Sequence, residues 1–155
     1  MKSLASLIND LEQYLPYIDQ KNEKISQATV GWHIEHSLLA LVKMISATEH
    51  SDPAHYRRKF NLKRLAVLSL GMIPRGRATV PDSTKPGDEI NEFTILPLLE
   101  KARQKTEKFE KLSNDKFFTH PVFGDLRTGK ARRIIAIHTY HHIKIIKEIL
   151  NGINS

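Results

Sequence analysis

The chain has 155 residues, of which 40% are hydrophobic and 26% are charged, and its formal net charge at pH 7 is +7. These values fit a single globular domain, residues 1–155, that is long enough to bury a core, and they exclude a chain that is disordered throughout. The sequence contains no cysteine, which excludes disulfides, a cysteine nucleophile and metal sites with thiolate ligands.

The N-terminal segment predicts a helix over residues 3–15. Pro16 ends a run of apolar residues at helical spacing, namely Leu4, Leu7, Ile8, Leu11 and Leu15. Asp10 and Glu12 lie where an export sequence stays uncharged, so the segment is not expected to be a signal peptide. No window reaches the roughly 18 uninterrupted apolar residues of a membrane span. We therefore expect a cytoplasmic protein without a membrane partner.

A second, longer helix is predicted from an N-cap at Ser26 to about residue 47. Trp32, His33 and His36 lie off its core stripe, with Trp32 and His36 close together in projection. The stripe itself is formed by Ile34, Leu38, Leu41 and Ile45. Apolar residues on more than one face of this helix fit either deep burial or a helix-mediated homodimer.

A third helix is predicted over residues 62–72, and an irregular segment, 74–88, follows it. The segment holds three prolines and two glycines, and loops of this length often lie across a functional site. The basic run 56–64 is interpreted as a solvated loop and helix start. Because no helix-turn-helix, zinc-finger or RNA-binding signature accompanies that run, we do not expect a nucleic-acid partner.

A fourth helix is predicted over residues 91–112, with Pro97 in its first turns. A connector rich in aromatic and turn residues, 117–126, leads to a final helix over 128–152 that ends at Gly152. Helices with no alternating strand pattern indicate an all-α fold. The expected architecture is an up-down four-helix bundle with an extra short helix and a long irregular loop.

The final helix carries histidines on the face that it should bury. His138 and His142, four residues apart, share a stripe with Ile134, Ile145 and Ile149, and two such imidazoles can direct a ring nitrogen to one point. A third ligand would come from the second helix, which supplies His33 and His36. Three protein ligands plus an open position are typical of a reactive metal site. A single histidine in such a stripe is more often a hydrogen-bonded core residue, so the metal hypothesis depends on both helices carrying a cluster.

Residues next to the candidate ligands in the sequence are not expected to bind the metal themselves. His141 lies about 60° from His138 around the helix and is a candidate donor to a ligand ring rather than a ligand. Trp32 and Tyr140 are interpreted as packing residues, with Tyr140 on a partly exposed face. Glu35 lies about 100° from His36, which makes it a poor general base.

Two segments, 31–40 and 138–142, together resemble the DinB-like superfamily of metal-binding four-helix bundles. The resemblance implies that His36, His138 and His142 are the ligands of a divalent metal. Segments 73–77 and 120–126 resemble an uncharacterised DinB-like branch, so the similarity spans about residues 27–147. Where the family often has a glutamine after the last ligand, this chain has Lys144 and two isoleucines, which puts substrate contacts in doubt. For His120 two roles stay open, lining the site mouth or capping a turn, and we favour the turn.

The resemblance implies an enzyme with a small-molecule substrate. Characterised relatives transfer low-molecular-weight thiols such as bacillithiol and mycothiol, and a bound metal lowers the pKa of the thiol. Arg75 and Arg77 from the irregular loop could bind carboxylates of such a thiol cosubstrate. Zinc, nickel, iron and manganese all remain open as the metal. A hydrolase is the weaker reading, because no carboxylate base is placed near the ligands. The alternative is a non-catalytic binding or dimerisation bundle with a structural or vestigial metal site.

Overall fold

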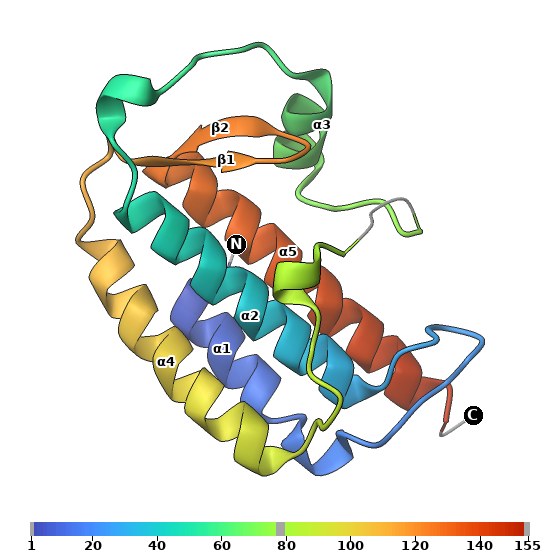
Figure 1. Ribbon diagram of the computed structural model, residues 1–155. Helices are drawn as coiled ribbons and strands as arrows, with labels where there is room; N and C mark the ends of the chain where they lie inside the picture. Colours follow the sequence, from blue (N-terminus) through green and yellow to red (C-terminus); the bar gives the residue numbers. More distant parts are fainter. Residues whose placement is uncertain (1, 77–79, 154–155) are drawn as a thin grey trace.

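Four helices pack side by side around the core of the protein (Figure 1). The structure is a computed structural model that describes residues 2–76 and 80–153. The four helices are α1 (Leu4–Glu12), α2 (Val30–Glu49), α4 (Glu92–Glu110) and α5 (Thr128–Asn151). The predicted helical bundle is thereby confirmed. A shorter helix, α3 (Leu62–Leu70), lies in the long connection between α2 and α4, as expected.

The directions of the helices differ from a simple up-down arrangement. The start of α2 lies beside the start of α4, where a Cβ added at Gly31 would come within 2.9 Å of Ile90 Cγ2. Further along both helices, Lys105 of α4 forms an ion pair with Glu49 of α2. Helices α2 and α4 therefore run in the same direction (Figure 1), because the connection 50–91 returns along the bundle.

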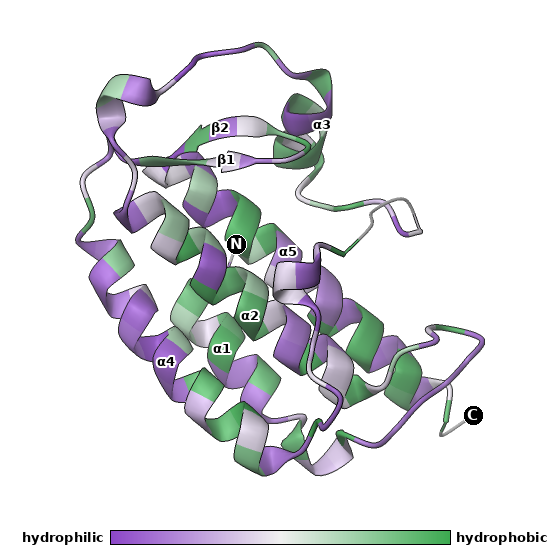
Figure 2. Ribbon diagram, viewed as in Figure 1, coloured by the Kyte–Doolittle hydropathy of each residue, from purple (hydrophilic) through white to green (hydrophobic). Residues whose placement is uncertain are grey.

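The apolar faces of α2 are accounted for by burial inside the bundle. This helix packs against both α4 and α5. Figure 2 shows hydrophobic residues along much of its length. Its buried apolar side chains include the whole predicted stripe, Ile34, Leu38, Leu41 and Ile45, all fully buried. Burial of each such side chain contributes about 1.5–3 kcal/mol. Within the described residues, none of the helices combines the length and apolar character needed to cross a membrane.

The N-terminus of α2 lies later than predicted. The cap is Thr29, whose Oγ1 accepts a hydrogen bond from the backbone N–H of Trp32 at 3.1 Å. Ser26, the predicted cap, instead accepts from the backbone N–H of Ala28 at 3.1 Å. Both residues can accept such a bond, and the packing of the start of α2 against Ile18 selects Thr29.

The predicted connector before α5 is a β-hairpin. Strands β1 (Phe117–His120) and β2 (Gly124–Arg127) pair antiparallel, with Phe118 opposite Leu126. Each strand has four residues, which is too short for alternation to stand out in the sequence. In its turn, His120 Nδ1 accepts from the backbone N–H groups of Val122 and Phe123, at 3.0 and 3.3 Å. The prediction that His120 caps a turn is confirmed.

Helix α3 presents an unusual apolar outer face. Val67 is buried, whereas Leu62, Leu65 and Leu70 are 69%, 52% and 70% exposed. The basic run 56–64 extends into α3 and has a structural role there, since the Arg64 guanidinium donates to the Phe123 carbonyl at 3.1 Å and so ties α3 to the hairpin.

Candidate metal centre

Three imidazole rings meet between α2 and α5. His36 comes from α2, and His138 and His142 come from α5 one helical turn apart. One nitrogen from each ring lies within 4.8 Å of the other two. The ring centroids are 4.7 Å apart for His36–His142 and for His138–His142, and 5.2 Å apart for His36–His138. The structure thus brings together the three residues expected as ligands, close enough to hold one metal ion.

The long loop between α3 and α4 lies against this cluster. The 3₁₀ turn Asp82–Thr84 contacts α2, and His36 Nδ1 donates a hydrogen bond to the Thr84 carbonyl at 2.8 Å. Because a carbonyl can only accept, the hydrogen of the neutral His36 ring is on Nδ1, and Nε2 keeps its lone pair. The expectation that this loop crosses the site is confirmed at Thr84.

A second contact, between a carboxylate and the backbone, holds the same loop to α2. Glu35 Oε1 accepts from the backbone N–H of Gly87 at 3.2 Å, and Glu35 is buried. Its carboxylate does not belong to the group of residues that could hold a metal within the described chain. Glu35 therefore acts as a loop clamp through Oε1, while its Oε2 is buried without a hydrogen bond in the described chain. Its place outside the cluster agrees with its predicted position about 100° from His36 around the helix.

A buried contact connects His142 to His33 of α2. Their Nδ1 atoms are 3.0 Å apart, and His33 Nε2 lies 3.0 Å from Ser26 Oγ. His33 is thus a neighbour of a ligand ring rather than a member of the three-ring cluster. Sequence spacing placed His33 near the site but could not show this contact, because it depends on how α2 and α5 pack.

Aromatic packing surrounds the cluster. The Trp32 ring stacks on His36 with centroids 4.9 Å apart and planes 16° from parallel, which confirms Trp32 as a packing residue. The His141 ring approaches the His142 ring edge-on at 5.2 Å. Among the described residues no hydrogen bond joins His141 to a ligand ring, so the structure does not support His141 as a donor. Tyr140 is 43% exposed, as expected.

Burial keeps the clustered imidazoles neutral. It lowers the pKa of His138 from 6.5 to about 3, with the nearby charges of His36 and His141 adding to the effect. The pKa of His142 is lowered well below 6.5 and that of His36 is also lowered, both mainly by burial. Neutral imidazole is the form that binds a metal.

The donor set fits a divalent ion. The ring of His138 makes no hydrogen bond within the described chain, and its Nδ1 is buried. An unpaired buried polar atom costs about 1–3 kcal/mol, a cost that binding a cation at this ring would offset. His36 and His142 each use Nδ1 in a hydrogen bond, and for His36 the carbonyl partner leaves Nε2 with a free lone pair. All three candidate ligands are uncharged, so they would not neutralise the charge of a bound divalent ion.

Of the two arginines predicted from the irregular loop, the structure describes only Arg75. Arg75 forms an ion pair with Glu148 of α5 at 2.6 Å, and its charge adds to the burial that lowers the pKa of His141. Arg75 therefore lies near the site but is engaged with α5. Arg77 lies outside the described residues.

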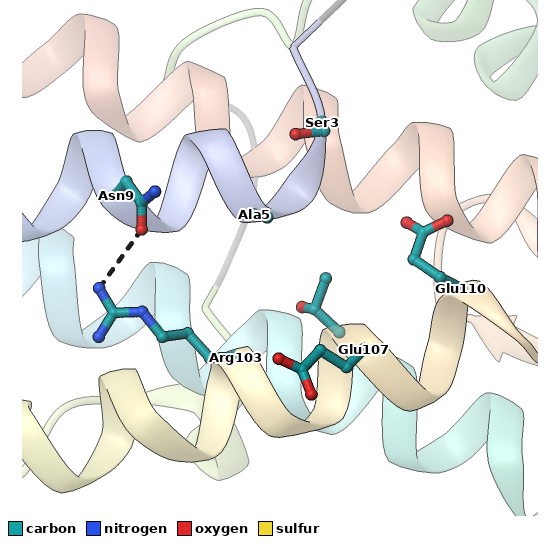
Figure 3. A pocket seen from close by; sticks show the side chains of 7 residues that line it. Ser3, Ala5, Asn9, Arg103, Glu107 and Glu110 are labelled. Atoms are coloured by element: carbon teal, nitrogen blue, oxygen red, sulfur yellow. Dashed lines mark hydrogen bonds between the residues drawn. The ribbon is translucent and has the colours of Figure 1, made fainter.

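Two hollows on the surface lie away from the histidines. One of about 350 Å³ lies between α1 and α4, where Arg103 donates to Asn9 at 3.3 Å (Figure 3). Another, of about 600 Å³, lies between α3 and α5 and is lined by Leu70, Ile137 and Tyr140 among others. Neither hollow is lined by a candidate ligand.

No family model, curated protein or solved structure matches the chain.

Proposed function

We propose that this protein is a divalent-metal-dependent enzyme of the DinB-like kind, a low-molecular-weight thiol S-transferase. The observation that carries the proposal is the convergence of three neutral imidazoles from two helices, with one nitrogen of each within 4.8 Å of the others. The order of the helices, with α2 and α5 supplying the ligands and a long connection between α2 and α4, supports the DinB-like assignment.

The neutral donor set suits thiol activation. A divalent ion held by three uncharged rings keeps its full charge and would lower the pKa of a bound thiol. In the proposed reaction the thiol loses its proton to water and its sulfur forms a bond to an electrophilic carbon. The bond from that carbon to a leaving group such as halide breaks, and the leaving group departs with the bonding electron pair. The protein needs no cysteine of its own for this, and it has none. Zinc, nickel and iron suit three imidazoles well, and manganese less so because it favours oxygen ligands.

Hydrolysis is less well supported by the arrangement. A metal-bound water would need a carboxylate base, and the nearest carboxylate in sequence, Glu35, is engaged by the Gly87 N–H. Arg75 lies where it could bind an anionic group of a cosubstrate once it leaves Glu148. Both observations favour transfer of a thiol that carries an anionic group over hydrolysis.

Metal analysis of untagged protein tests the proposal. We expect near-stoichiometric zinc, nickel, iron or manganese in the parent, its loss in His138→Ala, and its retention in His55→Ala, a control histidine whose side chain is 78% exposed. The loaded parent should consume bacillithiol or mycothiol in the presence of an alkyl halide, and His138→Ala should not. A parent that binds none of these metals under any loading condition would refute the proposal.

A second candidate function, a dimerisation module, is favoured by one observation. Helix α3 exposes Leu62, Leu65 and Leu70, and a second copy of the chain could cover these apolar side chains. Sedimentation velocity of the parent and of Leu65→Glu decides the matter. A dimer that the substitution dissociates supports this candidate, and a monomeric parent at high protein concentration rejects it.

A further inference from the structure

A hydrogen-bonded chain leads from the metal centre towards the start of α2. His142 Nδ1 lies 3.0 Å from His33 Nδ1, and His33 Nε2 lies 3.0 Å from Ser26 Oγ. Ser26 Oγ also accepts from the backbone N–H of Ala28 at 3.1 Å. His33 and His142 are buried, whereas Ser26 is partly exposed. The chain thus connects one candidate ligand to a hydroxyl near the surface.

The Nδ1-to-Nδ1 contact permits two arrangements of hydrogens. A neutral imidazole carries one N–H, so only one of the two facing nitrogens can hold the hydrogen between them. In the first arrangement His142 donates from Nδ1, and His33 then carries its own hydrogen on Nε2 and donates it to Ser26 Oγ. In the second, His33 donates from Nδ1, its Nε2 accepts from the Ser26 hydroxyl, and His142 carries its hydrogen on Nε2.

Only the first arrangement leaves His142 competent as a ligand. There its Nε2 has a free lone pair, whereas in the second the same atom carries a hydrogen and cannot bind a metal. Both arrangements contain three hydrogens, one each on Ser26, His33 and His142, so no proton is gained or lost between them. The Ser26 hydroxyl oxygen has two lone pairs, which suffice to accept from both Ala28 and His33 in the first arrangement.

We infer that His33 is a positioning residue that selects the metal-binding tautomer of His142 through this chain to Ser26. The inference rests on the proposed metal site and deepens it. His36 needs no such partner, because the Thr84 carbonyl already fixes its tautomer. His138 makes no hydrogen bond within the described chain. His142 is therefore the candidate ligand whose tautomer depends on His33, a ring that can either accept a hydrogen bond from His142 or donate one to it. Metal binding at His142 Nε2 holds the chain in its first arrangement.

An isosteric pair of variants separates the hydrogen bond from packing. Asn and Leu have the same branched skeleton, and in His33→Asn the Oδ1 atom stands near the place of the lost Nδ1 and can accept from His142. His33→Leu fills the same space without an acceptor. His141→Leu is the matched control, because the His141 ring also contacts His142 but is not hydrogen-bonded to it within the described chain.

Zinc affinity, measured by competition with a chromophoric chelator, gives the first result. We expect His33→Leu to bind zinc about 10- to 100-fold more weakly than the parent, the usual range for losing a group that orients a ligand. His33→Asn and His141→Leu should stay close to the parent. If His33→Leu binds as tightly as the parent does, the inference is overturned while the metal centre stands. A parent that binds neither zinc nor any of the other three metals overturns both.

Histidine ¹⁵N chemical shifts of the parent give a second result that needs no variant. In the zinc-loaded protein we expect the hydrogen of His33 on Nε2 and that of His142 on Nδ1. Finding the His33 hydrogen on Nδ1 instead overturns the inference, whatever the affinities are. This measurement also decides the question if His33→Leu does not fold.

Discussion

The metal-free protein should lose stability in mild acid because of its buried histidines. Burial lowers the pKa of His138 from 6.5 to about 3, and that of His33 from 6.5 to about 4. Between each folded-state value and 6.5 the unfolded chain binds a proton that the folded chain does not. Stability is therefore fully present above pH 6.5 and falls with pH through this window, until the folded-state pKa is reached.

The size of the effect follows from the pKa difference. One pKa unit corresponds to about 1.4 kcal/mol, so lowering the pH from 7 to 4.5 should cost about 2–3 kcal/mol through His138 alone. In His138→Leu this contribution disappears, and the difference in unfolding free energy between the two pH values should shrink by that amount. Ile145→Val, on the same buried stripe of α5, alters packing without removing a titrating group and should keep the parent's pH dependence.

Urea unfolding of metal-free protein at pH 7 and pH 4.5 provides the measurement, with the three proteins compared at matched ionic strength. The reasoning is refuted if His138→Leu loses as much stability between the two pH values as the parent does. In that case the imidazole would be as easily protonated in the folded chain as in the unfolded one.

Three further predictions concern the surroundings of the site. Burial lowers the pKa of His138 to about 3 and also lowers those of His36 and His142, so protons should release bound metal only well below pH 6; metal content after dialysis across a pH series checks this, and release close to pH 6 would contradict it. Glu35→Ala removes the acceptor of the Gly87 N–H and should speed amide exchange in residues 80–90, measured by hydrogen-exchange mass spectrometry; unchanged exchange would show that Glu35 is no clamp. His120→Ala leaves two turn N–H groups without their acceptor and should cost about 1–3 kcal/mol of unfolding free energy with zinc affinity unchanged, and a loss of affinity would instead place His120 in the site.

Several elements were predictable because their signals are local. The spacing of apolar residues along 3–15 and 128–152 identified helices that the structure has at Leu4–Glu12 and Thr128–Asn151. The same periodicity placed His138 and His142 on one face, because the angle between residues four apart is set by the helix itself. These features need no knowledge of the rest of the chain.

Other features depended on which segments meet. The hairpin at 117–127 forms because two four-residue strands pair with each other, and neither strand has a periodic signal of its own. Helices α2 and α4 are parallel because the connection 50–91 runs back along the bundle to the end at which α2 begins. The periodicity of the individual helices does not predict this path. The choice of Thr29 over Ser26 as a cap is likewise made by packing.

The amino-acid pattern alone determined that the last helix carries a histidine pair on one face and that the second helix carries a histidine cluster, and it predicted that the two would share a metal. From the residues themselves, His33 and His36 remained equally open as the third ligand. The tertiary structure decided between them, placing His36 in the cluster and His33 behind His142. The physical reason is that rotation and register between two helices are set by the packing of their whole shared face, a sum over many side chains distant in sequence, whereas spacing within one helix is set by its own backbone hydrogen bonds.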